Sequence, residues 1–91
     1  MAKIKIKLYA TLREILGKDT IFLEANSVRG AIDELIRQYP VLKDVIVNKD
    51  SSLKDDYIYL VNGRNVVFLQ GENTPLKDGD KVTIFPPVGG G

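Results

Sequence analysis

The side chains that most often perform chemistry in proteins are absent from this chain. Its 91 residues include no cysteine, no histidine and no tryptophan. The sequence therefore lacks the commonest nucleophile, the commonest base at neutral pH and the usual ligands of zinc. It also cannot form disulfides, so it does not resemble a cysteine-stapled secreted scaffold. Carboxylates, lysines and the glycines at the C-terminus are the candidates that remain.

Two groups of polar residues could hold a metal ion, but turn chemistry explains both better. Asp78 and Asp80 flank Gly79, and an Asp-Gly-Asp sequence is far more often a turn than a metal site. The polar stretch 48–52 weakly resembles a calcium-binding loop. It lacks both the glycine of the sharp turn and the closing glutamate. We therefore expect no bound metal.

The C-terminal segment has the most unusual sequence in the chain. Residues 86–91 read Pro-Pro-Val-Gly-Gly-Gly. At a glycine usage of about 7%, two glycines in succession at one given place arise by chance in roughly 0.5% of chains. A frayed end without a function is the ordinary explanation, and a functional tail is the alternative.

Composition and charge narrow the class of protein. Hydrophobic residues make up 44% and charged residues 27% of the chain, as in an ordinary globular domain. Thirteen basic and twelve acidic residues leave a formal net charge of +1, whereas nucleic-acid binders usually carry a basic excess. No apolar run approaches the roughly 20 residues that cross a bilayer. We expect one soluble, cytoplasmic domain that binds neither nucleic acid nor membrane.

The N-terminal segment has the alternation of a half-buried strand. Ile4, Ile6 and Leu8 alternate with three lysines, and Tyr9 falls on the lysine side. The row of Lys3, Lys5 and Lys7 could bind phosphate, but a solvated face that resists edge aggregation is the better interpretation.

The remaining elements follow from periodicity and breakers. Ser27 is a good N-cap and Pro40 marks a helix end, and between them apolar residues recur at spacings of three and four. Residues 10–17 suit a short helical segment that ends at a glycine, and residues 41–56 a turn or helix followed by a loop. Further strands are predicted at 20–24, 57–61 (apolar throughout, as in a central strand), 65–69 and 81–85. This order predicts an α+β two-layer sandwich, with a core made of Ile4, Ile6, Leu8, Ile32, Leu35, Ile36, Val82 and Ile84.

Both ends of the sequence resemble the MoaD/ThiS family of ubiquitin-like sulfur carriers. The resemblance covers residues 60–63 and 75–91, and residues 12–17 are similar to the family's opening. The motif Phe85-Pro86-Pro87-Val88 before the glycines resembles the small subunit of molybdopterin synthase most. The resemblance implies a ubiquitin-like β-grasp: a mixed sheet, one main helix packed across it, and parallel first and last strands. The domain would span 1–88, with residues 89–91 as a flexible glycine tail.

The resemblance also implies a function in which the chain is a substrate and not an enzyme. An adenylating, E1-like enzyme would join the Gly91 carboxylate to AMP at the expense of ATP, and a sulfur donor would leave a thiocarboxylate there. The large catalytic subunit of molybdopterin synthase would take this sulfur for the molybdenum cofactor. Gly89 and Gly90 would let the tail thread a narrow active site, since glycine has no Cβ. The chain itself would bind no cofactor.

Strand parity extends this expectation to a partner-binding surface. If the alternating apolar residues face the helix, Tyr9 and Phe85 point away from it, and parallel strands bring their rings together beside the tail. With Pro86, Pro87 and Val88, they are the candidate partner-binding residues. Three alternatives remain: a carrier for thiamine synthesis or tRNA thiolation, a modifier joined to lysines of target proteins, and an interaction module with an inert tail.

Overall fold

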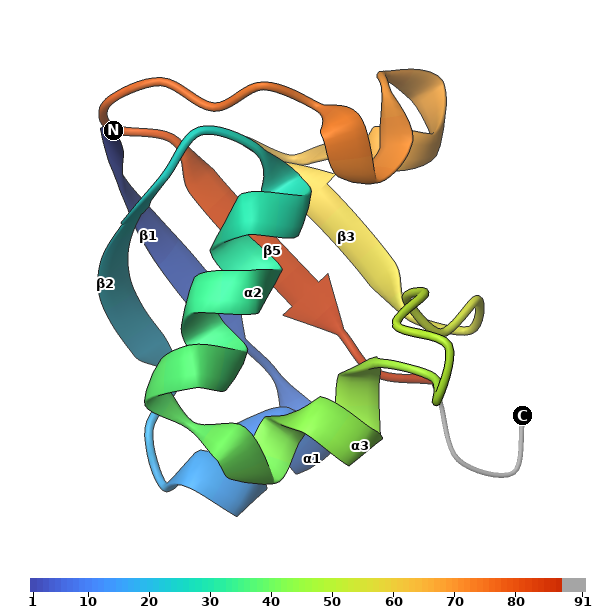
Figure 1. Cartoon of the computed structure of the whole chain (residues 1–91). Coiled ribbons are helices and arrows are strands. Elements are labelled where there is room, and N and C mark those ends of the chain that lie inside the picture. The colour runs from blue at the N-terminus through green and yellow to red at the C-terminus, as the bar shows by residue number, and fades with distance from the viewer. Residues whose placement is uncertain (88–91) are drawn as a thin grey trace.

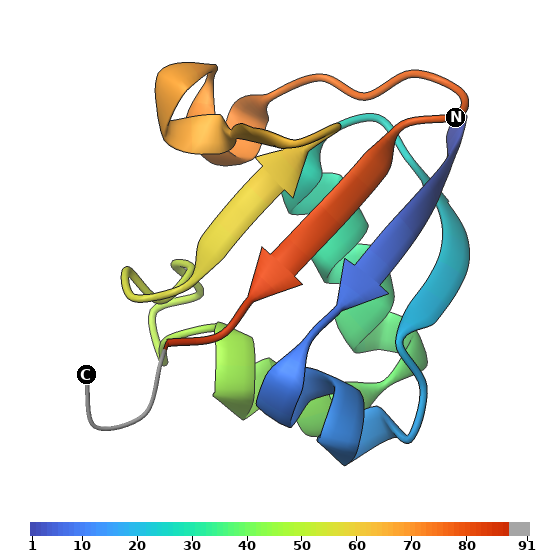
Figure 2. The same ribbon diagram turned by 180° about the vertical axis from the view of Figure 1, so that it is seen from behind.

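The protein, described here by a computed structural model for residues 1–87, is built on one mixed sheet. Its strand order is β2-β1-β5-β3-β4. β1 and β5 are parallel, and every other neighbouring pair is antiparallel. The strands are β1 Ala2–Leu8, β2 Thr20–Ala25, β3 Ile58–Val61, β4 Arg64–Asn65 and β5 Lys81–Phe85. The predicted side-by-side, parallel arrangement of the first and last strands is therefore confirmed, and Figure 2 shows these two arrows running in the same direction.

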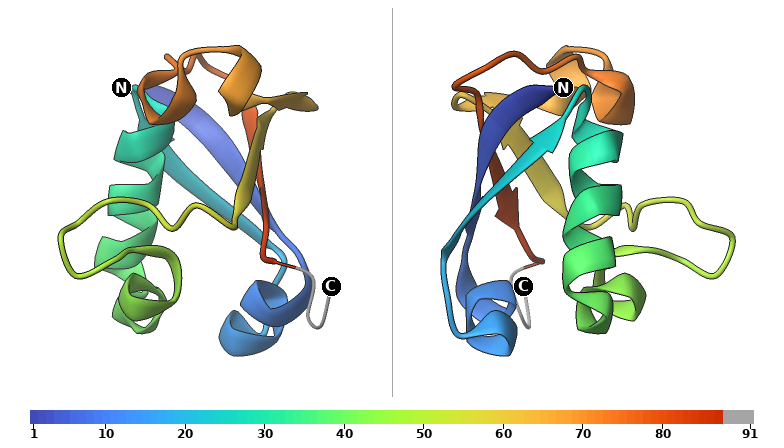
Figure 3. Two further views of the ribbon diagram at one scale, coloured as in Figure 1. Left: turned by 90° about the vertical axis from the view of Figure 1, so that its right-hand side faces the viewer. Right: turned by 60° about the vertical axis from the view of Figure 1, so that its left-hand side comes forward.

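One long helix crosses one face of the sheet and forms the second layer (Figures 1 and 3). This helix is α2, and the Ser27 side chain caps its first turn by accepting a hydrogen bond from the Gly30 backbone N–H at 3.0 Å. It ends where the Tyr39 backbone N–H donates to the Leu35 carbonyl, just before a proline. The helices are α1 Ala10–Leu16, α2 Val28–Gln38 and α3 Lys43–Ile46, and the 3₁₀ turns are η1 Pro40–Leu42, η2 Val66–Phe68 and η3 Gly71–Asn73.

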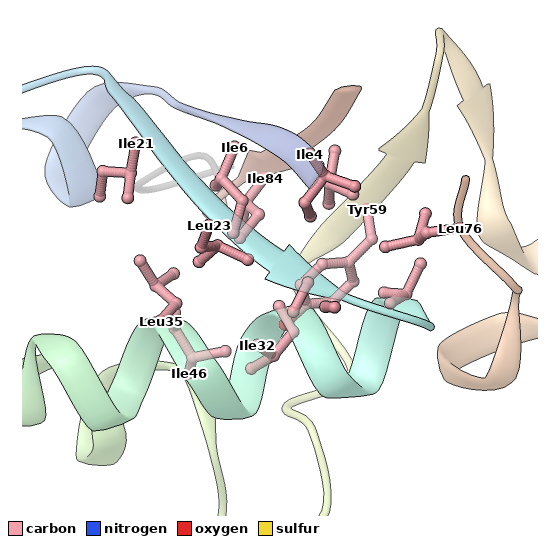
Figure 4. Packing of buried hydrophobic residues seen from close by; sticks show 14 of the residues in the cluster. Ile4, Ile6, Ile21, Leu23, Ile32, Leu35, Ile46, Tyr59, Leu76 and Ile84 are labelled. Carbon is pink, nitrogen blue, oxygen red and sulfur yellow. The ribbon is translucent and has the colours of Figure 1, made fainter. Parts of the chain in front are cut away.

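The core lies between α2 and the sheet (Figure 4). Seven of the eight predicted core residues are buried, and Ile36 is half-buried against the cluster. The alternation of β1 therefore indicated the buried face correctly. None of the helices within residues 1–87 has the length and apolar character needed to span a membrane.

The segment around residues 57–69 differs from the prediction in two ways. The predicted strand at 65–69 is wrong: only its first residue lies in β4, and the chain then turns into η2. The Asn65 side chain accepts a hydrogen bond from the Val67 backbone N–H, which starts the 3₁₀ turn. In addition, β3 is an internal strand with β5 and β4 beside it, as predicted, but its Ile58 is 46% exposed, which a run that is apolar throughout did not indicate.

Candidate functional site

The parallel register of β1 and β5 brings the two predicted aromatic residues together. Leu8 pairs with Ile84 at the end of the ladder, so Tyr9 and Phe85 are the next residues on neighbouring strands. Their ring centroids lie 4.7 Å apart and the planes are inclined by 18°, which is a stacked arrangement. Both residues are half-buried. The predicted proximity of the two rings is confirmed, whereas partner binding at this place remains a prediction.

The aromatic pair sits on the face of the sheet that α2 does not cover. Phe85 pairs with Ile58 of β3 in the antiparallel register, so an exposed aliphatic side chain lies next to the stacked rings on the same face. The sequence did not single out Ile58, because a run that is apolar throughout gives no indication of which residues face outward. Together Tyr9, Phe85 and Ile58 make a small apolar surface, called here the aromatic cluster.

Backbone conformation after β1 holds Tyr9 in place. Tyr9 is the N-cap residue of α1 and has an extended backbone. The next residue, Ala10, has a φ of 52°. A non-glycine residue in this left-handed region is strained and persists only where surrounding structure imposes it. The turn from β1 into α1 therefore fixes the direction of the Tyr9 side chain.

The two prolines after β5 have different surroundings. Pro86 is buried, whereas Pro87 is exposed. Pro86 therefore fastens the chain to the body directly after Phe85 and offers no exposed side chain in the free protein. The predicted roles of Val88, Gly89, Gly90 and Gly91 lie outside the described residues.

The carboxylates considered as metal ligands are occupied by backbone and amide donors. Asp78 accepts a hydrogen bond from the Lys3 backbone N–H at 2.8 Å. Asp80 is buried and accepts from the Lys77 backbone N–H at 2.8 Å and from the Asn62 side-chain amide at 2.9 Å. The Lys77 hydrogen bond, followed by that from Asn62, lowers the pKa of the Asp80 carboxyl. These residues stabilise the turn into β5, as expected of Asp-Gly-Asp.

The role of Asn62 was not apparent from the sequence, which indicated only a turn. Its side-chain carbonyl accepts from the Lys81 backbone N–H at 2.9 Å, and its own backbone N–H donates to the Lys81 carbonyl. Asn62 therefore joins the turn after β3 to the first residue of the central strand. Its left-handed backbone, with a φ of 51°, is one that asparagine adopts more readily than most residues.

The other polar candidates also have local partners. In the loop at 48–52, Asp50 accepts hydrogen bonds from the side chain and the backbone N–H of Ser52, and these lower the pKa of Asp50. Lys7 forms an ion pair of 3.3 Å with Asp19. Within residues 1–87, no group of three or more acidic, histidine or cysteine residues is arranged to hold a metal ion.

The order of the mixed sheet, with parallel β1 and β5, and the helix that crosses one face define a ubiquitin-like β-grasp protein. A solution structure with this fold, that of small archaeal modifier protein 1 from Methanosarcina acetivorans, matches with a TM-score of 0.91 at 40% identity. The match covers 100% of this chain and 98% of that chain.

Sequence comparison gives the family. The ThiS family matches residues 6–91. Small archaeal modifier protein 3 of Haloferax volcanii is 35% identical over 92 residues, which cover 98% of this chain and 99% of the relative. The molybdopterin synthase sulfur carrier subunit of Dictyostelium discoideum is 28% identical, over 98% of this chain and 96% of the relative. The chain belongs to the ThiS family of ubiquitin-like proteins, which includes sulfur carriers and protein modifiers.

Proposed function

We propose that this protein is a sulfur carrier that acts as the small subunit of molybdopterin synthase, with the Gly91 carboxylate as its reacting group. The observation that carries the proposal is the stacked pair of Tyr9 and Phe85. Phe85 comes directly before the two prolines that lead to the glycines. This pair offers a partner an apolar anchor at the base of the reactive segment. Aromatic anchors of this kind contribute strongly to interfaces when a partner covers them.

The chemistry requires a partner enzyme for each step. In the first step, a Gly91 carboxylate oxygen attacks the α-phosphorus of ATP, pyrophosphate leaves, and a mixed anhydride with AMP forms. In the second step, hydrosulfide released by a sulfur donor attacks the acyl carbon, AMP leaves, and a thiocarboxylate forms without any change of oxidation state. The large subunit of the synthase then uses this sulfur for the molybdenum cofactor. The carrier itself only positions the reacting carboxylate. Pro86 is packed against the body, and the glycines offer no side chain that would obstruct a narrow groove.

Modification of proteins is the second candidate function, and the similarity to small archaeal modifier protein 3 favours it. It shares the first step with sulfur transfer. In its second step, a lysine amine of a target protein displaces AMP, or a thiol that has replaced AMP, and forms an amide bond with Gly91. The two functions therefore differ in what attacks the activated carboxylate.

Removal of Gly91 tests the step that both functions share. The deletion moves the carboxylate back by about 3.3–3.6 Å, the length of one extended residue. Reacting atoms must lie within roughly 3–3.5 Å of each other, so adenylation is expected to be abolished. The assay is ATP–pyrophosphate exchange with the adenylating enzyme, and Gly90→Val is expected to fail for steric reasons. Unchanged melting temperatures and an active Lys49→Ala variant, altered in an exposed loop, are the controls.

Intact mass of the native protein distinguishes the second steps. An oxygen-to-sulfur exchange at Gly91 supports the carrier. Ladders of target proteins joined to Gly91, without this exchange, support the modifier. Retained exchange activity in the variant that lacks Gly91 contradicts the assignment of Gly91 as the reacting residue. An unchanged mass of the native protein, with no exchange activity, would make it an interaction module with an inert tail.

A further inference from the structure

The strand β2 forms a free edge of the sheet, far in sequence from the C-terminal segment. At the opposite edge β4 has only two residues and the chain then turns into η2, so within residues 1–87 the six-residue strand β2 is the long uncovered edge. Figure 1 shows β2 beside β1 with no strand on its outer side. Such an edge carries a row of backbone groups that can pair with another strand.

The ladder register identifies the backbone groups that face outward. The Leu8 backbone N–H donates to the Asp19 carbonyl, so this pair and every second pair along the antiparallel ladder exchange hydrogen bonds. Ile21 and Leu23 therefore direct their backbone groups toward β1. The N–H and C=O groups of Thr20, Phe22 and Glu24 point away from it, and no hydrogen bond from the described loops, turns or caps reaches them.

An exposed aromatic ring stands in the middle of this edge. Phe22 is 75% exposed, and its side chain lies on the face of the sheet that α2 leaves open, opposite Lys5 of β1. A shallow hollow beside it is lined by Lys3, Lys5, Phe22, Glu24 and Gly79, with the backbones of two core residues below. An unpaired edge strand is a template for pairing with another chain, and the exposed ring adds apolar surface at the place where a paired strand would lie.

The charge next to Phe22 is predominantly positive. Lys5 lies beside Lys81 of β5 in the parallel register, and Lys3 is on the same face two residues along. Among residues 1–87, none of these three lysines takes part in an ion pair. Two carboxylates lie near the lysines: Glu24 is opposite Lys3, and Asp78 accepts a hydrogen bond from the Lys3 backbone N–H. The surface of Phe22, Lys3, Lys5 and Lys81, called here the β2 surface, therefore suits an occupant that is both apolar and acidic.

We propose that β2 binds an extended, acidic segment of a partner protein as an additional strand of the sheet. The backbone groups of Phe22 and Glu24 would pair with the segment, one apolar side chain would cover the Phe22 ring, and carboxylates would reach across β2 to Lys3 and Lys5. The added strand and β1 would lie on opposite sides of β2, about 9.6 Å apart at the usual spacing of about 4.8 Å, so the long lysine side chains would have to extend over β2 to meet the carboxylates. A second copy of this chain fits less well, because its own lysines would add to the same positive face. The site is distinct from the aromatic cluster and does not depend on the reactivity of Gly91.

The test uses the full chain and a short synthetic peptide in which aspartate, valine and aspartate are separated by threonines, so that an added strand presents one valine and two carboxylates on the same face. In an NMR titration, we expect the largest shifts at the amides of Thr20, Phe22 and Glu24, and slower hydrogen exchange at Phe22 and Glu24. The same peptide with lysine in place of each aspartate, which keeps the valine and the threonines and reverses the charge, is the matched control. It is expected to bind at least tenfold more weakly in low salt, because surface charge interactions are then least screened.

Two exposed substitutions and two controls localise the binding. Phe22→Ala and Lys5→Glu are each expected to lower the affinity for the aspartate peptide at least fivefold. Phe68→Ala, which removes a ring that is 82% exposed on η2, and Lys49→Glu should leave it unchanged. Equal binding of both peptides, shifts centred on Tyr9 and Phe85, or no binding at millimolar peptide overturns the proposal. A dimer of the free protein that Phe22→Ala dissociates also overturns it, because the occupant is then a second copy.

Discussion

The stacked rings of Tyr9 and Phe85 permit a quantitative test of the aromatic cluster. The perturbation is a double-mutant cycle that comprises Tyr9→Ala, Phe85→Ala and the double variant. Truncation of a fully buried Phe to Ala costs about 3–5 kcal/mol. Phe85 is half-buried, so we expect about 1.5–2.5 kcal/mol for its truncation, in proportion to the buried part of the ring. A stacked pair adds about 0.5–1.5 kcal/mol beyond the area that it buries.

The two substitutions should therefore not be additive. Once one ring is gone, the other has already lost its partner, so the double variant should be more stable than the sum of the single effects predicts, by about 0.5–1.5 kcal/mol. Urea denaturation followed by far-ultraviolet circular dichroism measures this, since the chain has no tryptophan to report by fluorescence. A coupling energy below about 0.3 kcal/mol, the usual error of additivity, refutes the idea that the stack holds the two strand ends together.

The same variants test binding of a partner. Phe85→Ala should weaken binding of the adenylating enzyme or the large synthase subunit by about 1 kcal/mol or more, which is roughly fivefold. Phe68→Ala is the matched control, because it removes a more exposed ring at a distant edge of the sheet. Loss of folding in Phe85→Ala together with unchanged affinity would show that the ring is structural only.

Three further predictions concern the body of the protein. Asp80→Asn should cost about 1–3 kcal/mol, because it places an amide where a buried carboxylate accepts two hydrogen bonds. Since folding lowers the pKa of Asp80 below its ordinary value of 3.8, the contribution of this carboxylate is present above that pH. This contribution is lost as the pH falls through the pKa that Asp80 has in the folded protein. The free energies of unfolding of the unaltered protein and of Asp80→Asn should therefore converge in acid. Leu35→Ala should cost about 2–5 kcal/mol by denaturation, because the side chain lies on α2 and is fully buried against the sheet, and a cost near zero would contradict this packing. Ser27→Ala should cost about 1 kcal/mol through loss of the N-cap, and Ser27→Asp should restore most of it.

Periodic segments with clear ends were predictable from the sequence. The alternation of Ile4, Ile6 and Leu8 with lysines gave the buried face of β1, because only one face of this part of the sheet is covered. Ser27 gave the start of α2 through its cap. The family resemblance supplied the parallel pairing of the first and last strands. With that pairing, the alternation of side chains along each strand puts Phe85 and Tyr9 on the same face, next to each other.

Segments governed by local side-chain hydrogen bonds were not predictable. Residues 65–69 have the β-branched and aromatic composition of a strand, but the Asn65 side chain competes for the Val67 N–H and starts a 3₁₀ turn. The partnership of Asn62 with Asp80 joins turns that are far apart in sequence, so no local pattern reveals it. The exposure of Phe22 was equally hidden, because alternation tells which face a residue is on and not whether that face is covered.

The parallel pairing of β1 with β5 also has a consequence for the order of folding. Among the strands of residues 1–87, the central strand β5 is synthesised after the other four, and β1 must wait for it while the whole intervening chain is made. Contacts between residues so distant in sequence are slow to form, because closing the long loop costs entropy before the contact repays it. Ile6 and Leu8 therefore remain without their Val82 and Ile84 neighbours until β5 has left the ribosome. Premature termination before β5 would leave an open apolar layer that proteases and chaperones recognise, so the sheet completes only in chains that extend at least to the base of the glycine segment.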